Sequence, residues 1–310
     1  MNSPVAYAQR YLDLSIPRVD TGADLATGLR VSKYLLGLKS AQSDFRAKLL
    51  RKLKKDLAAG RAKQPGYAIQ VRVRTATDDE ERRYTEVTSK ENDPLWMLIR
   101  YPFAGKGSPE GIQAALQLAA TDGPGEKALV AAGKLQETCD QLLGVDCNGF
   151  VGSFLRFGHQ ATPWWNLAST ANTVSANDLI STIWRKASGV ERKSPAEVDP
   201  KDLNLLVLVD SVGKVIPGGK PPHGHIAISE PGRSTSTKWT AAGLRVPPGT
   251  MVPAILVTES TGAKQKNGEN GVVTSWYHYV SHPRLGKQGV FLVHRGLNGK
   301  TMAVRIKALS

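Results

Sequence analysis

The chain has 310 residues, of which 41 are Lys or Arg and 27 are Asp or Glu, giving a formal net charge of +14. A hydrophobic content of 41% with 22% charged residues excludes a mostly disordered chain. Two cysteines exclude a disulfide framework, and their spacing is not that of zinc ligands, so we predict neither a metal nor a cofactor. No apolar run approaches the ~18 residues that a membrane span needs.

The first 63 residues are predicted to be helical, with a break at Pro17 and an end at Gly60. Eight basic residues and one acidic residue lie within 46–63. Apolar residues recur every four positions through this stretch, which is typical of a helix with one packed face. These residues are Ala41, Phe45, Leu49, Leu53 and Leu57. We interpret the stretch as a core-packing helix with a solvated basic face, and a dedicated polyanion site is the alternative.

The middle of the chain predicts a hairpin and two helices. Alternating apolar residues on either side of TDDEE predict a β-hairpin at 67–90, before a mixed apolar segment of unclear type at 91–105. A helix is expected at 108–120, where Ser108 is an N-cap and Pro109 occupies the first turn. A second helix is expected at 126–144.

From residue 200 onward the pattern changes to strands. The nearly all-apolar run at 203–211 is typical of a strand covered on both faces. Further strands are predicted at 223–229, 254–260, 271–281, 289–296 and 301–309. Helices followed by an antiparallel-leaning sheet indicate an α+β fold. We predict a boundary near residue 105, with a helical and hairpin region of unknown role at 1–105 and a second domain at 106–310.

Cys147 is the first candidate functional residue. It opens an aromatic-rich stretch and is expected at or near the N-terminus of a mostly buried helix. The positive end of a helix dipole and its unpaired N–H groups stabilise a thiolate, and the same groups can hold an oxyanion. A buried structural cysteine is the alternative.

His225 and Glu259 are the other two candidate catalytic residues. His225 begins a short apolar strand after a Gly/Pro loop, as expected of a base presented at the lip of a cleft. Glu259 lies near the end of the following strand, where a buried carboxylate needs a partner such as a histidine on the neighbouring strand. A structural histidine and a solvent-facing carboxylate are the alternatives, and His278 competes as the third residue.

The hexamer DCNGFV at 146–151 resembles the D-C-S-G-F/L-V nucleophile motif of NlpC-like and CHAP-like cysteine peptidases and amidases, which have a papain-type fold. Residues 203–209 and 224–229 resemble the two strands that follow the nucleophile helix in that family, in the same order. The resemblance covers roughly 126–262. It implies Cys147 as nucleophile, His225 as general base and Glu259 as the third residue. Asn148 departs from the motif, because the family usually has Ser there.

The resemblance also implies a fold and an activity. The expected fold is a papain-like, NlpC-type core with helices packed on an antiparallel sheet and an insertion at about 158–200. Trp164, Trp165 and Trp184 of that insertion either wall a substrate cleft or simply pack. The implied activity is hydrolysis of an amide bond, above all in bacterial cell-wall peptide, as an amidase or endopeptidase.

Two other functions stay open on the sequence. One is a non-catalytic module that binds a polyanion or the cell wall on a degenerate hydrolase fold, and the other is a thiol acyltransferase or deamidase that acts on a protein. The expected partners are peptidoglycan or another amide substrate and, given the charge, an anionic polymer surface; the oligomeric state is left open. Because no signal peptide is visible, we expect a cytoplasmic protein or one exported by a non-Sec route, such as a delivered effector or a phage-type lysin.

Overall fold

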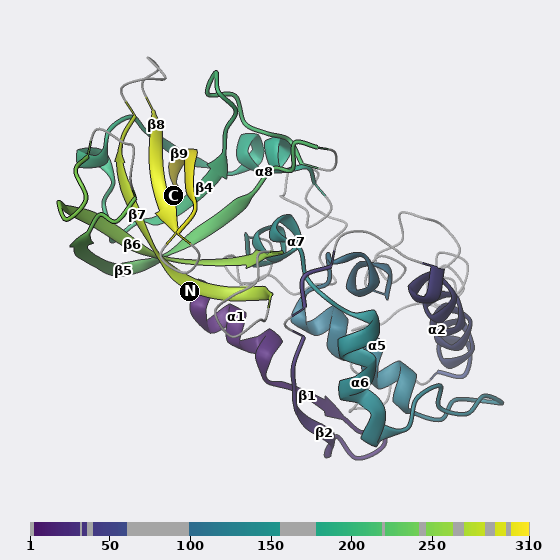
Figure 1. Ribbon diagram of the computed structural model, residues 1–310. Helices are drawn as coiled ribbons and strands as arrows, with labels where there is room; N and C mark the ends of the chain where they lie inside the picture. Colours follow the sequence, from purple (N-terminus) through teal and green to yellow (C-terminus); the bar gives the residue numbers. More distant parts are fainter. Residues whose placement is uncertain are drawn as a thin grey trace. The chain divides into compact units, whose positions relative to one another are not determined.

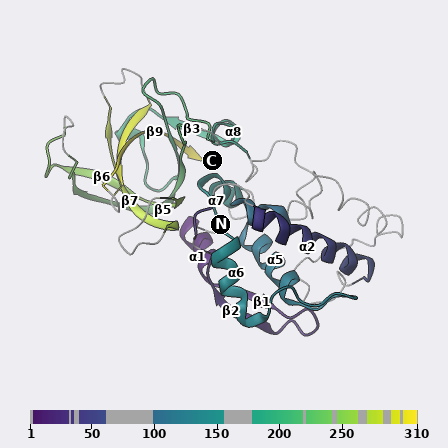
Figure 2. The same ribbon diagram turned by 45° about the vertical axis from the view of Figure 1, so that its right-hand side comes forward.

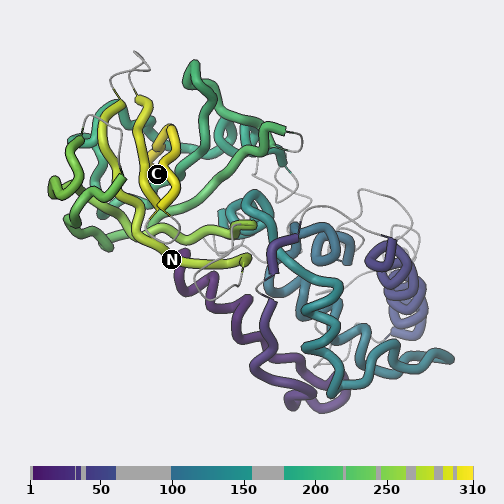
Figure 3. Tube along the Cα trace, viewed as in Figure 1, coloured from purple at the N-terminus to yellow at the C-terminus, as the bar shows by residue number. Residues whose placement is uncertain are grey.

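The computed structural model describes residues 3–31, 33–35, 40–60, 99–155, 178–218, 221–241, 246–262, 270–282, 289–295 and 299–309. The chain divides into two compact units. Figure 3 traces the chain through them from purple at the N-terminus to yellow at the C-terminus. Unit 1 contains Met1–Ala8, Cys147–Ala161 and Asn172–Ser310, and unit 2 contains Gln9–Asp146 and Thr162–Ala171. The domain boundary predicted near residue 105 stays a prediction. The hairpin predicted at 67–90 lies outside the described residues, as do Trp164 and Trp165.

Unit 2 combines helices of different lengths with a small hairpin (Figure 1). Its elements are the end of α1 (Pro4–Leu12), β1 (Leu14–Pro17), β2 (Asp24–Leu29), α2 (Ser40–Ala58), η2 (Tyr101–Ala104), α5 (Pro109–Ala120), η3 (Ala132–Lys134) and α6 (Leu135–Leu142). The prediction of a helical N-terminus is wrong for 14–29, where β1 and β2 pair antiparallel. Leu14 and Ile16 are buried and alternate with half-buried neighbours, which is the period of a strand, and the amide of Gln117 on α5 donates to the Pro17 oxygen at 2.7 Å.

The helix ends of unit 2 follow their sequence signals in part. The Ser108 hydroxyl accepts a hydrogen bond from the Gly111 N–H at 3.1 Å, as predicted for an N-cap. The helix predicted at 126–144 is wrong in its first part, because helical structure begins only at η3. The N–H groups of Leu129 and Val130 instead donate to the Ala119 oxygen, at 2.7 and 3.1 Å, and so complete the end of α5.

Helix α2 has the packed face that its periodicity predicts. Leu49 and Leu53 are fully buried, and the helix is followed by Gly60 in a left-handed conformation. Lys52 and Asp56, four residues apart, are buried as well, which the pattern did not predict. The exposed cations of the same helix include Lys48, Arg51, Lys54 and Lys55.

Unit 1 is built on a closed antiparallel barrel of six strands (Figure 2). The strands are β4 (Leu203–Leu208), β5 (Ile226–Lys238), β6 (Met251–Thr261), β7 (Gly271–Ser281), β8 (Val290–Arg295) and β9 (Thr301–Leu309). Each strand pairs with the next, and β9 closes the barrel by pairing with both β8 and β4. A short strand, β3 (Gly189–Arg192), extends the sheet along the second half of β9. The predicted α+β class is confirmed, with the sheet closed into a barrel.

The barrel is filled by apolar side chains that alternate along its strands. Its buried cluster includes Leu206, Ala227, Ile255, Val257, Tyr277, Tyr279, Phe291, Val293, Met302, Val304 and Ile306. Two helices, α7 (Cys147–Ser153) and α8 (Ile180–Lys186), contact barrel strands from outside this cluster. Among the described residues, no helix has the length and apolar character needed to cross a bilayer.

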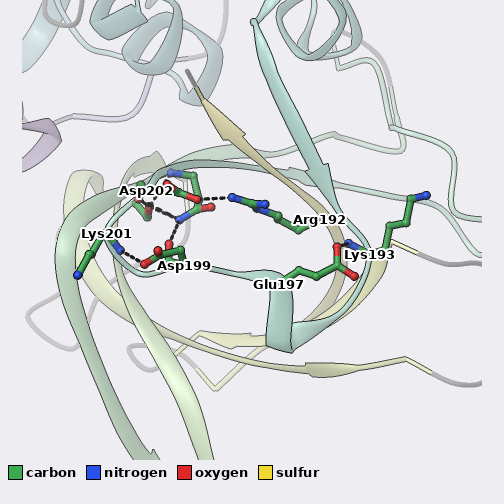
Figure 4. Close-up of polar contacts among 8 residues, drawn as sticks. Arg192, Lys193, Glu197, Asp199, Lys201 and Asp202 are labelled. Carbon is green, nitrogen blue, oxygen red and sulfur yellow. Dashed lines mark hydrogen bonds and ion pairs between the residues drawn. The ribbon is translucent and has the colours of Figure 1, made fainter.

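The segment from β3 to β4 is held by its own polar contacts (Figure 4). Arg192 forms an ion pair with Asp202, and the Lys193 N–H donates to a carboxylate oxygen of Glu197 at 3.0 Å. Val198, which follows η6 (Pro195–Glu197) and precedes Asp202, belongs to the buried cluster of the barrel. These contacts therefore hold an apolar side chain against the barrel core.

Candidate active site

Cys147 is the first residue of α7, as the sequence predicted, and only 4% of it is exposed. The helix is fixed within unit 1 by Phe150 and Phe154, which lie four residues apart and therefore on one face. Both are buried, and their ring centroids lie 6.1 and 5.5 Å from that of Tyr7. Because α7 also contacts β5 and β6, the cysteine is carried by a helix packed beside the strands of the two other predicted residues.

His225 immediately precedes β5. The strand predicted at 223–229 begins only at Ile226, but the His225 oxygen still accepts a hydrogen bond from the Leu208 N–H at 2.9 Å. The backbone of His225 thus continues the pairing of β4 with β5. Its side chain keeps 16% exposure, so solvent reaches the imidazole at the edge of the barrel.

The structure brings the three predicted residues into one chain of contacts. His225 Nε2 lies 2.5 Å from Oε2 of Glu259, which is fully buried on β6. The Cys147 side chain is hydrogen-bonded to the same imidazole. Because Glu259 occupies Nε2, Nδ1 is the ring nitrogen left for the sulfur. The order of contacts is therefore thiol, imidazole, carboxylate.

The pKa values of the imidazole and the carboxylate move in opposite directions. Burial alone would lower the pKa of His225, but the Glu259 charge and hydrogen bonds from Cys147 and Glu259 outweigh it and raise that pKa to about 9. Burial alone would raise the pKa of Glu259, but His225 and Arg295 lower it to about 2. The site therefore holds an imidazolium and a carboxylate at neutral pH.

Arg295 is a site residue that the sequence reasoning missed. It is buried at the end of β8, and its Nε donates to Glu259 Oε1 at 3.0 Å. Its guanidinium carbon lies 5.9 Å from the ring centroid of Tyr277. Phe291, Val293 and Arg295 alternate along β8, so a basic residue on the inward face of an apolar strand was the signal available in the sequence.

His278, the competing third residue, lies elsewhere. Its Nδ1 is 3.2 Å from the main-chain oxygen of His294, and the two imidazole centroids are 6.1 Å apart. The neighbouring Tyr277 belongs to the barrel cluster, so His278 points to the opposite face of β7. The carboxylate that contacts His225 is that of Glu259.

Trp184 packs rather than standing open to solvent. It is 7% exposed, and Lys307 Nζ lies 4.6 Å from its ring centroid. The same amine donates to the main-chain oxygens of Trp184 and Ala187, the latter at 3.1 Å, at the end of α8. Of the two roles expected for this tryptophan, packing is the one that its burial supports.

Among the described residues, no group of three or more His, Cys, Asp or Glu side chains could hold a metal ion. The donors that meet at the site are a thiol, an imidazole, a carboxylate and a guanidinium. Comparisons of the chain with models of protein families, with curated proteins and with solved structures found no match.

Proposed function

We propose that the chain is a papain-like cysteine hydrolase that cleaves an amide bond, with Cys147 as nucleophile and His225 as general base and acid. The observation that carries the proposal is the chain of contacts from the Cys147 thiol through the imidazole to the buried Glu259 carboxylate. A nucleophile, a base and a group that orients the base, each touching the next, form the minimal arrangement for nucleophilic catalysis.

The reaction follows from where the proton resides. In the resting site the thiol proton is held by His225 as an imidazolium, and the Cys147 thiolate attacks the amide carbonyl to form a tetrahedral intermediate. The imidazolium then donates that proton to the leaving amine, and the C–N bond breaks to give a thioester. A water molecule, deprotonated by His225, attacks the thioester and releases the acid and the free thiol. Glu259 holds the ring in one orientation and stabilises its charged form throughout.

The order of the elements along the chain supports a papain-like assignment. A short helix that begins with the nucleophile packs beside strands of a closed antiparallel barrel. The strands at 203–208 and 226–238 follow it in the chain order of the NlpC-like resemblance. The resemblance and the net charge of +14, which suits anionic envelope polymers, lead us to propose bacterial cell-wall peptide as the substrate.

Turnover by the purified full-length chain tests the proposal. Peptidoglycan and synthetic peptide amides are incubated with the parent, with Cys147→Ala and with Cys139→Ala, and newly exposed amines and carboxylates are quantified. The parent and Cys139→Ala should release products, while Cys147→Ala should release none above the rate without protein. Equal product release by the parent and Cys147→Ala would exclude the thiol mechanism.

A further inference from the structure

Arg295 holds both oxygens of the carboxylate that orients the imidazole. It lies directly opposite Tyr277 in the pairing of β8 with β7, and its side chain is 6% exposed. Its Nε donates to Glu259 Oε1 at 3.0 Å, and its Nη2 forms an ion pair with Oε2. Oε2 is also the atom that contacts His225. Arg295 therefore holds the Glu259 carboxylate in place while the same carboxylate contacts His225.

We propose that Arg295 is a positioning residue of the thiol site, which keeps Glu259 ionised and fixes its carboxylate plane so that Oε2 points at the His225 ring. This inference rests on the proposed function. Arg295 acts through Glu259, because its guanidinium contacts that carboxylate and the Tyr277 ring. A guanidinium suits the role, since its parallel N–H donors match the two oxygens of a carboxylate.

The charges around the base explain why a cation is needed there. Five titratable or charged groups from different parts of unit 1 gather at this point: Cys147, His225, Glu259, Tyr277 and Arg295. Burial, together with the Glu259 charge, raises the pKa of Tyr277 well above its ordinary value, so the phenol is neutral. Once the thiol proton has moved to the imidazole, two cations alternate with two anions.

Removal of Arg295 would leave this buried cluster with an excess negative charge. The side chain of Glu259 has no exposure, and a buried carboxylate without a cation takes up a proton. A protonated Glu259 can no longer favour the imidazolium, so the pKa of His225 would fall. The direct effect of Arg295 on His225 has the opposite sign. Arg295 is a nearby cation, so the loss of its charge alone would make the pKa of His225 rise. The direction of the change therefore tells the two roles apart.

The test is a histidine titration by NMR, in the full-length parent and in Arg295→Gln, with the His225 resonance identified by its loss in His225→Ala. We expect the pKa of His225 to fall by about one to three units in Arg295→Gln. A rise, or no change, would overturn the proposal. In a Glu259→Gln background, Arg295→Gln should cause no further fall, because the residue through which it acts is already neutral; a further fall would also overturn it.

Arg305→Gln is the matched control. Arg305, on another strand of unit 1, donates from its Nε and Nη2 to the two carboxylate oxygens of Glu191, and each hydrogen bond is 2.5 Å long. Arg305→Gln should leave the pKa of His225 unchanged. If Arg295→Gln fails to fold, Arg295→Lys carries the test. The lysine keeps the charge but not the paired donors, so it should retain a raised pKa of His225 while Cys147 alkylation by iodoacetamide slows severalfold. A parent-like alkylation rate in Arg295→Lys would contradict the fixing role.

The same measurements separate this inference from the proposed function. If Cys147 of the parent reacts with iodoacetamide no faster than in the unfolded chain, the thiol mechanism fails, whatever Arg295 does. If the parent reacts fast and Arg295→Gln keeps the parent pKa of His225, only the role of Arg295 is wrong.

Discussion

The side-chain amide of Asn148 donates a hydrogen bond of 2.8 Å to the main-chain oxygen of Asp178. Two residues later, the Ile180 N–H donates to the Pro217 oxygen, also at 2.8 Å. The segment 178–180 is therefore tied at one end to the residue that follows Cys147 and at the other to the loop that leads to His225. The departure from the Ser of the resembled motif thus has a structural role.

Replacement of Asn148 by that Ser should destabilise the protein without abolishing its chemistry. The shorter hydroxyl cannot span the distance to the Asp178 oxygen, so the hydrogen bond is lost at a cost of about 1 kcal/mol. Urea denaturation measures the loss, and iodoacetamide should still react with Cys147 at the parent rate. Asn148→Asp is the more demanding variant. It places a carboxylate next to the main-chain oxygen of Asp178, and the two groups repel each other, so this variant should be less stable than Asn148→Ser. A serine variant as stable as the parent would show that the bond contributes nothing.

The two cysteines should differ sharply in reactivity. Burial, and after it the nearby Asp140 charge, raise the pKa of Cys139 to about 12, whereas the Cys147 thiol is hydrogen-bonded to an imidazole. At neutral pH, iodoacetamide should therefore label Cys147 and leave Cys139 unmodified, as read by mass spectrometry of proteolytic peptides.

Two controls bracket the labelling experiment. In guanidinium chloride both cysteines should be labelled, which shows that Cys139 is protected by the fold. In His225→Ala the rate at Cys147 should fall, because the imidazole no longer accepts the thiol proton. Comparable labelling of both thiols in the folded parent would contradict the assignment.

Stability should depend on pH through His225 and Glu259. The folded-state pKa of His225, about 9, lies above its ordinary 6.5, so its contribution is complete below pH 6.5 and is lost as the pH rises through about 9. The folded-state pKa of Glu259, about 2, lies below its ordinary 4.5, so its contribution is present above pH 4.5 and is lost as the pH falls toward 2. The pair therefore stabilises the fold most between pH 4.5 and 6.5.

Urea unfolding of the parent and Glu259→Gln across this range checks the prediction. The difference in unfolding free energy should be largest in that window and shrink toward both extremes. Glu191→Gln, which breaks the half-exposed pair with Arg305, is the control. The difference in unfolding free energy between Glu191→Gln and the parent should stay constant between pH 6 and 10. A level difference for Glu259→Gln as well would mean that His225 gains nothing from this carboxylate.

Strands were predictable where one short stretch of sequence carried the whole signal. The strands at 271–281 and 301–309 were predicted with the bounds that β7 and β9 have, because each run of alternating or apolar residues follows a Gly-containing polar stretch of the sequence. The helix predicted at 126–144 was too long. The first residues of this stretch do not form helical hydrogen bonds, because their N–H groups are used to complete the C-terminal end of α5. The N–H groups of Leu129 and Val130 bond there, and no local pattern reports that partner.

The candidate site was predictable to the extent that each residue carried its own local signal. Cys147 follows a break and opens a helix, His225 follows a Gly/Pro loop, and Glu259 is a carboxylate in a strand that must be buried. Arg295 was missed because its partner depends on pairing across three strands. The barrel brings β8 beside β7, and β7 beside β6, with Arg295 opposite Tyr277 and Glu259 opposite Val273. The two residues are therefore not register partners, and they meet only through their long inward-facing side chains.

Gly224, immediately before His225, offers a steric test of how closely the base must be placed. A Cβ at this position would lie 2.6 Å from the main-chain oxygen of Ile216 and 2.9 Å from Cδ1 of Ile180. The Ile180 side chain can turn away, but the backbone oxygen cannot, so Gly224→Ala must move the chain that carries the imidazole. Displacement of a base by about 1 Å can cost on the order of 100-fold in rate.

We therefore expect Gly224→Ala to lower amide hydrolysis on the order of 100-fold while the protein still folds. The displaced ring should lose its contact with Glu259, so the pKa of His225 should fall in the same NMR titration. Gly133→Ala is the control, because a Cβ there meets no atom within 4 Å and the backbone is not in the left-handed region; it should behave as the parent. Full activity in Gly224→Ala with an unchanged pKa of His225 would mean that the loop yields without moving the base, and that catalysis does not depend on this close contact.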